Sequence, residues 1–175
     1  MKTLRHLRGV TLIELMTTIS VVVTTLTIGV PTFNSIQSSM QRGQATTELV
    51  TSLMLARSEA ARRAVSVTVC ASATGTTCDT GEALNWPRGW IVFTDINENH
   101  AVDAGTDEII HVTHFDRASF RITPESAMQG GVTFHDSGYP DHAGNFSYSD
   151  SQQSRTLALN YIGRVEQIRT GPGTP

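Results

Sequence analysis

The sequence has very little lysine, few charges overall and no excess of positive charge. Lys2 is the only lysine among 175 residues, so a phosphate-binding loop lysine and lysine Schiff-base chemistry are excluded unless the extreme N-terminus supplies them. Charged residues make up 17% of the chain, and 13 Lys and Arg against 16 Asp and Glu give a net charge of −3. Any binding of nucleic acid must therefore be local. The length fits one ordinary domain.

Motifs that mark hydrolases are also missing. The chain contains neither G-x-S-x-G nor H-E-x-x-H. His111 and His114 are three residues apart in a predicted strand, so their side chains point to opposite faces and cannot share a metal directly. We therefore expect no enzymatic activity and no cofactor.

The first 30 residues consist of a basic segment followed by an apolar one. Residues 1–9 carry three Lys or Arg residues and no acid, whereas residues 10–30 carry a single charge, Glu14. At about 1.5 Å per residue, a helix over residues 10–30 reaches about 31 Å, roughly the thickness of the hydrocarbon core of a bilayer. We predict that this segment crosses a membrane once. The positive charges place its N-terminal side in the cytoplasm and the rest of the chain on the far side.

The junction between the two segments, Arg8-Gly9-Val10-Thr11-Leu12-Ile13-Glu14, resembles the processing site of type IV prepilins and pseudopilins. The resemblance implies that prepilin peptidase cleaves between Gly9 and Val10, that Val10 is then N-methylated, and that Glu14 is the family's fifth mature residue. Val10 stands where the family usually has Phe. Inserting a carboxylate near the centre of a bilayer costs roughly 2.5 to 3.5 kcal/mol of free energy, so Glu14 needs a partner there. The α-amino group of a neighbouring subunit is suitable; the alternative is a plain anchor with Glu14 at the interface.

Residues 31–64 are predicted to continue the helix as an amphipathic half. Pro31 removes one backbone donor and clashes with the preceding turn, so a kink is expected there. Apolar residues recur at helical spacing at Ala45, Leu49, Leu53, Ala56 and Ala60. This stripe is expected to pack on a globular head, while Glu59 pairs with Arg62 and Arg63 on the outer face.

Residues 65–175 are predicted to form a mostly antiparallel β head. Short β-rich runs separated by Gly, Asn, Asp and Pro lie at 65–69, 90–94, 108–114, 118–122, 132–134, 145–149 and 156–168. In the first run, valines alternate with polar residues. The expected aromatic core contains Trp86, Trp90, Phe93, Phe134 and Tyr161. The predicted fold class is therefore α+β, a long N-terminal helix packed on an antiparallel β head, as in type IV pilins.

Three further segments look like FimT-type minor pilins and the related GspH-type minor pseudopilins. They are residues 48–72 (ELVTSLMLARSEAARRAVSVTVCAS), 85–112 (NWPRGWIVFTDINENHAVDAGTDEIIHV) and 160–169 (NYIGRVEQIR). The resemblance implies a minor pilin that primes or caps pilus assembly, with other major and minor pilins and the inner membrane as partners. Its head would lie in the periplasm and then in the pilus at the cell surface. The alternatives are a GspH-type pseudopilin of a type II secretion system and a membrane-anchored enzyme or binding module, which an unprocessed Gly9 would indicate.

Two cysteines, Cys70 and Cys78, are the only ones in the chain. They are not accompanied by a second cysteine pair or a nearby histidine, which does not suit a zinc site. Outside the inner membrane the surroundings are oxidising, so we expect a disulfide between the end of a strand and its loop. Two free thiols are the alternative.

The segment that begins at residue 95 opens like a calcium-binding loop, with oxygen-bearing side chains at alternating positions. The pattern then fails, because His100 replaces the turn glycine and Thr106 replaces the bidentate glutamate. The sequence therefore does not predict a complete calcium-binding loop or any other metal site. The candidates for weak calcium binding are Asp95, Asn97, Asn99 and Asp103, and the alternative is a hairpin loop capped by its own side chains.

The C-terminal segment has a local excess of positive charge. Several FimT-like proteins resemble one another in a Gly-Arg-x-Arg run that contacts DNA; Gly163 and Arg164 match it, but Glu166 replaces the second arginine. The last 21 residues carry Arg155, Arg164 and Arg169 against one acid, a side-chain charge of +2. We predict weak, sequence-independent, salt-sensitive binding of double-stranded DNA, which would contribute to natural transformation. The alternative is an edge strand that uses its arginines for solubility.

Overall fold

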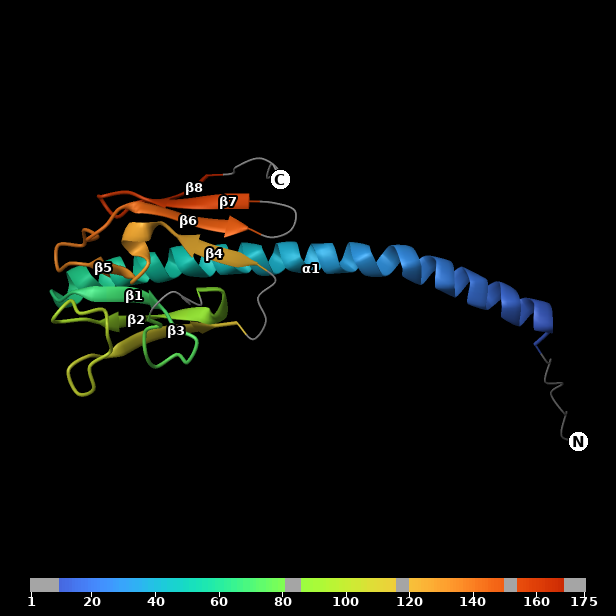
Figure 1. Ribbon diagram of the computed structural model, residues 1–175, viewed down its shortest axis with the longest axis horizontal. Helices are drawn as coiled ribbons and strands as arrows, with labels where there is room; N and C mark the ends of the chain where they lie inside the picture. Colours follow the sequence, from blue (N-terminus) through green and yellow to red (C-terminus); the bar gives the residue numbers. More distant parts are fainter. Residues whose placement is uncertain (1–9, 81–85, 116–119, 150–153, 169–175) are drawn as a thin grey trace, which may run out of the picture. The chain divides into compact units, whose positions relative to one another are not determined.

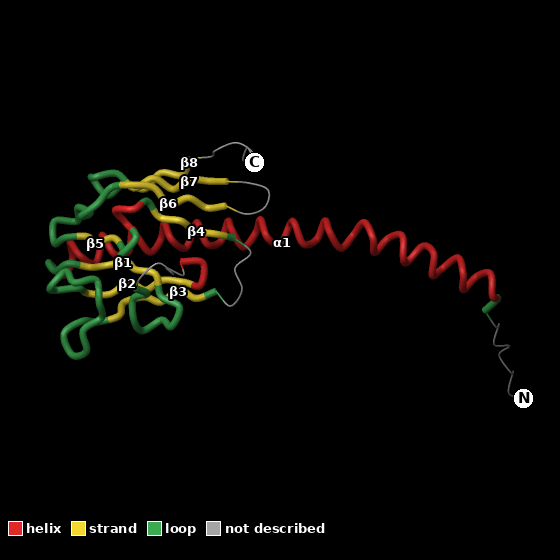
Figure 2. Tube along the Cα trace, in the orientation of Figure 1, coloured by secondary structure: helices red, strands yellow, loops and turns green. Residues whose placement is uncertain are grey.

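The computed structural model describes residues 10–80, 86–115, 120–149 and 154–168; inside the helix, the side chains of 28–32, 34, 35, 38, 39 and 42 are left out. The chain divides into two compact units, Met1–Ser39 and Met40–Pro175, each of which is described by itself. Helix α1 spans Leu12–Arg63 and contributes to both units. Beyond the helix, the described regular structure is mostly strand (Figure 2).

The first unit is built from the N-terminal part of α1. The helix continues through Pro31, as the sequence predicted, because the helical hydrogen-bond pattern extends well beyond this residue. The kink at Pro31 remains a prediction. Apolar side chains of this unit are more than half exposed, among them Leu12, Ile13, Met16, Ile19, Val21 and Leu26.

The second unit packs the C-terminal part of α1 between two four-stranded antiparallel sheets (Figure 1). The first sheet has the order β3 (Ile109–His114), β2 (Gly89–Thr94), β1 (Val67–Ala71) and β5 (Val132–Phe134). The second has the order β4 (Arg121–Pro124), β6 (Gly144–Ser149), β7 (Ser154–Leu159) and β8 (Val165–Ile168). Two short 3-10 helices, η1 (Trp86–Arg88) and η2 (Ser126–Met128), lie in the connections. The α+β architecture is as predicted.

The apolar stripe of α1 faces the core of this unit. Its five predicted members, Ala45, Leu49, Leu53, Ala56 and Ala60, have no exposed surface. The indole N–H of Trp90 donates to the Ser52 hydroxyl at 2.9 Å, which ties strand β2 to the helix. On the outer face, Glu59 contacts Arg62 and Arg63, as expected from their helical spacing.

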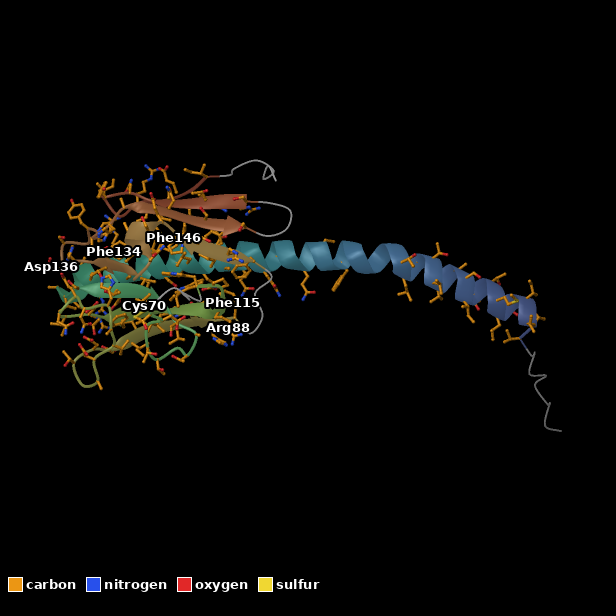
Figure 3. The ribbon with its side chains drawn as sticks, viewed as in Figure 1. Cys70, Arg88, Phe115, Phe134, Asp136 and Phe146 are labelled. Atoms are coloured by element: carbon orange, nitrogen blue, oxygen red, sulfur yellow. A yellow bond between two sulfur atoms is a disulfide. The ribbon has the colours of Figure 1, made fainter. Side chains whose placement is uncertain are left out.

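Four of the five predicted core aromatics are buried, and the fifth is not. Trp86, Trp90 and Phe134 belong to the main core together with Phe146 of β6. Figure 3 labels Phe134 and Phe146. Phe93 is buried in a separate cluster on the other face of the first sheet. Tyr161 was assigned to the core wrongly, because it lies in a turn and is 74% exposed.

One strand prediction also needs correction. The run 156–168 is interrupted by a turn at residues 160–164 that separates β7 from β8. The Asn160 side-chain oxygen accepts the backbone N–H groups of Ile162 and Arg164 there, and Gly163 has a φ of +73°. In β1 all five residues are buried, because a second apolar cluster with Cys70, Ile91 and Val102 covers the face opposite the main core.

Candidate functional site

The predicted processing and assembly residues lie where α1 begins. Gly9 is outside the described residues, and Val10 is 71% exposed just before the helix. The Thr11 hydroxyl accepts a hydrogen bond from the backbone N–H of Glu14 at 3.3 Å, so Thr11 caps the helix. The exposed Glu14 lies in the first turn, where a carboxylate interacts favourably with the helix dipole. The Thr-x-x-Glu spacing is the sequence signal for this cap.

The described hydroxyl groups between Thr17 and Thr27 are satisfied by the helix itself. Six of them donate to a carbonyl three or four residues earlier at 2.7 to 3.0 Å: Thr17, Thr18, Ser20, Thr24, Thr25 and Thr27. They therefore present little unpaired polarity among the exposed apolar side chains. In the part of the chain that the structure describes, which excludes the side chains of 28–32, no helical segment is both long and apolar enough to cross a membrane.

Cys70 and Cys78 form the predicted disulfide, with their Cα atoms 5.6 Å apart. The loop that it closes is held by further bonds, since the backbone N–H of Asp79 donates to the Ala71 carbonyl at 2.8 Å. Cys70 packs against Phe93 in the smaller apolar cluster. The disulfide therefore joins the end of β1 to its loop over the outer face of the first sheet.

The oxygen-bearing side chains of the loop after Asp95 bind the loop itself. Asp95 is fully buried and accepts hydrogen bonds from the Thr68 hydroxyl (2.8 Å) and from two backbone N–H groups of the loop (3.0 and 3.1 Å). Asp103 accepts the side-chain amides of Asn97 and Asn99 at 2.8 and 2.9 Å. In the described part of the chain, no three His, Cys, Asp or Glu residues gather as a metal site. The four calcium candidates thus form a self-capped loop.

Of the arginines predicted to contact DNA, the two described ones, Arg155 and Arg164, lie at opposite ends of strand β7. Arg155 lies opposite Tyr148 near the start of β7, whereas Arg164 follows the far end of that strand in the turn to β8. The Arg164 Nε atom lies 3.1 Å from a carboxylate oxygen of Glu166, so its charge is partly compensated. Arg169 is outside the described residues.

A groove that the sequence did not reveal lies on the second unit, between α1 and the turn that joins β7 to β8. We call it the Arg57 groove; its volume is about 820 Å³, and its lining residues are Met54, Arg57, Ser58, Ala61, Tyr139, Ile162, Gly163, Arg164 and Val165. The Arg57 Nη1 atom donates to the Gly163 carbonyl at 3.2 Å, across 106 residues of sequence. No local pattern could have revealed this contact.

The fold places this chain among proteins with the type IV pilin fold. It is similar to two crystal structures of the type IV minor pilin FimU from Pseudomonas aeruginosa strain PAO1, each 18% identical in sequence. The first has a TM-score of 0.56 and covers 75% of this chain and 90% of that one. The second has a TM-score of 0.53 and covers 72% of this chain and 91% of that one.

The sequence itself matches one protein-family model. Residues 45–163 match the family described as type II transport protein GspH, and this match spans more than half of the chain. The chain therefore belongs to the GspH family. A comparison with curated proteins found no match.

Proposed function

We propose that this protein is a minor subunit of a type IV pilus that primes or caps filament assembly and has no catalytic role. The observation that carries the proposal is the combination of a GspH-family head, the fold of a minor pilin, and a capped helix with exposed apolar side chains. An apolar helix whose described hydroxyl groups bond back to its own carbonyls suits contact with other helices in a filament.

The proposed path to the filament begins at the inner membrane. Residues 10–30 anchor the chain there with the N-terminus in the cytoplasm and the head in the periplasm. Prepilin peptidase then removes residues 1–9, and Val10 carries the new, methylated α-amino group. Glu14 of one subunit pairs with the amino terminus of a neighbouring major or minor pilin. Because Thr11 starts the helix immediately after Val10, that amino group stays outside the helical hydrogen-bond pattern.

Deletion of the gene tests this function. Loss of surface filaments, restored by the wild-type gene in trans, is the expected result, because a priming subunit is required before elongation begins. The purified filaments of the complemented strain should contain the protein at low copy number. Normal numbers of surface filaments in the deletion strain would contradict the proposal.

The alternative is a GspH-type minor pseudopilin of a type II secretion system, which the description of the matching family favours. The residues that support processing and helix packing serve both machines equally. The same deletion separates them: in this case filaments remain and secreted proteins accumulate in the periplasm. Protein content of the culture medium should therefore be measured alongside the filament count.

DNA capture is a further part of the proposed function. Its support is the side-chain charge of +2 in the last 21 residues and the exposure of Arg164, whose side chain is 68% accessible. With two or three phosphate contacts, binding should be weak and should fall steeply with salt. Titration with duplex DNA should show weaker binding for Arg164→Gln combined with Arg169→Gln than for Arg121→Gln. Equal binding by the wild type, the double variant and Arg121→Gln would reject this site.

A further inference from the structure

We infer that the Arg57 groove is a docking site for a neighbouring filament subunit, which inserts a segment carrying an acidic side chain beside an apolar one. The inference rests on the proposed function, because it takes the neighbour from the filament. The groove belongs wholly to the second unit, whereas the exposed apolar side chains of the N-terminal part of α1 belong to the first. It would add a contact between heads to the contacts between helices.

Three large apolar or aromatic side chains that line the groove are more than half exposed. Met54 is 61% exposed, Ile162 is 57% exposed and Tyr139 is 53% exposed, although all three are large apolar or aromatic side chains. They come from three separate segments, namely helix α1, the turn before residue 140 and the turn between β7 and β8. Methionine, aromatic residues and arginine are enriched in the buried centres of protein interfaces. Such a patch, gathered from distant segments, is typical of an interaction surface.

The charge of the groove selects an acidic partner. Its charged lining residues in the described chain are Arg57 and Arg164, and none of the nine lining residues is acidic. Arg57 is held in place by its bond to the Gly163 carbonyl, which occupies one of the five donors of a guanidinium group. Arg164 is paired with Glu166, but both side chains are more than half exposed, so this pair is weak and exchangeable. A partner's carboxylate can therefore bind either guanidinium.

The walls of the groove are fixed before any partner arrives. Gly138 and Gly163 both have a φ above +70°, and a Cβ at Gly163 would lie 3.2 Å from both the Arg57 Cδ atom and the Gly138 carbonyl. The two turns thus approach the arginine closely because they carry glycine. The Asn160 side chain fixes the second turn through the N–H groups of two later residues. Little ordering is needed on binding, which favours affinity.

A protein segment fits these features better than a nucleic acid does. DNA would use the two arginines but would leave the three exposed apolar side chains without partners, whereas a polypeptide can bury them and supply a carboxylate. A subunit of a filament has neighbours that stay in contact with it throughout the life of the filament. The neighbouring subunit is therefore the occupant to which we commit.

Site-specific photocrosslinking in filaments tests the inference. The full-length protein carries p-benzoylphenylalanine in place of Tyr139, which is aromatic and half exposed, and purified filaments are irradiated. The matched control carries the same group in place of Val112, which is 45% exposed on the edge strand β3 of the other sheet. We expect the Tyr139 position to form an adduct with another filament subunit, through a peptide that holds Asp or Glu beside an apolar residue. The Val112 position should give little or no adduct.

Charge and apolar variants then test the chemistry of docking. Arg164→Gln and Met54→Ser should each reduce the adduct by about threefold or more, while Arg121→Gln, on the exposed side of β4, should leave it unchanged. A filament that contains the protein but gives no adduct at Tyr139, or gives an adduct with DNA, would overturn the inference and leave the proposed function intact. Absence of the protein from filaments would instead overturn the proposed function, and the docking site with it.

Discussion

At the scale of single residues, the start of α1 combines a local structural role of Glu14 with the assembly role that we propose for it. Glu14 donates its backbone N–H to Thr11 and places its carboxylate in the first helical turn. Its carboxylate remains exposed to solvent in the isolated chain. A charge in this position stabilises the helix only modestly, so its presence in an otherwise apolar segment points to a partner outside the chain.

Replacement of Glu14 by alanine should therefore leave insertion and cleavage intact but prevent entry into filaments. The helix becomes more apolar, so membrane insertion cannot be the step that fails. Immunoblots of membrane and filament fractions should show processed protein in the first and none in the second. Thr51→Ala, an exposed position on the same helix, is the control. Normal incorporation of the Glu14 variant would show that the carboxylate has no role in assembly.

Another residue-scale prediction concerns Glu98, which joins the segment after α1 to two loops of the head. Hydrogen bonds from the Ser66 hydroxyl (2.6 Å) and from His135 (2.9 Å) hold the pKa of this carboxyl below its ordinary value. A lowered folded-state pKa stabilises the protein above the unfolded-state value, and the contribution is lost as pH falls through the folded-state pKa. Stability should thus decrease on acidification below about pH 4.5.

The comparison of Glu98→Gln with wild type isolates this contribution. The variant should show a smaller difference in Tm between pH 6 and pH 3, and the effect should be small because the glutamate side chain is 45% exposed. Glu48→Gln on α1 serves as the control. The same pH dependence in wild type and Glu98→Gln would contradict the assignment.

At the scale of elements, the first sheet is covered by a helix on one face and by loops on the other. Helix α1 and the main core cover one face, and the disulfide loop together with the loop after Asp95 covers the other. This is why β1 and β2 are buried along their whole length, although short antiparallel strands commonly leave one face in water. The disulfide holds the cover of the second face in place.

Loss of the disulfide should therefore destabilise the head. Cys70 and Cys78 close a short loop, for which the expected loss is about 2 to 3 kcal/mol in the free energy of unfolding. Urea denaturation of the Cys70→Ser, Cys78→Ser double variant should show a lower midpoint than oxidised wild type. Reduced wild-type protein should behave like the variant. Equal midpoints for all three would show that the loop needs no covalent closure.

At the scale of the whole molecule, the sequence predicted what depends on local pattern. Helical spacing at Leu49 and Leu53 identified the buried stripe of α1, and alternating or β-rich runs located the strands within a few residues. The disulfide was also foreseen. The error at Tyr161 arose from a turn that the apolar pattern does not indicate: the Asn160 side chain closes the turn at residues 160–164, and Tyr161 is left exposed there.

Some candidate sites have a local signal in the sequence, whereas others depend on contacts between distant residues. The Thr11 cap had a local signal, whereas the Arg57 groove depends on a contact between residues 106 positions apart. The proposed arginines of the C-terminal segment share a local charge pattern, but a strand separates Arg155 from Arg164. Among the described residues, the charges of Arg155 and Arg164 therefore lie at separate places on the head, although they are close together when counted along the sequence.

The central claim, that this chain is processed as a prepilin and becomes a filament subunit, is tested most directly by the intact mass of the protein recovered from purified filaments. The account predicts that residues 1–9 are missing and that the new N-terminal Val10 carries one methyl group. Fragmentation of the N-terminal peptide should place the methyl group on the α-amino nitrogen. Protein that retains Lys2, Arg5 and Arg8 in cells with an active prepilin peptidase, or that is absent from the filaments, would contradict the account.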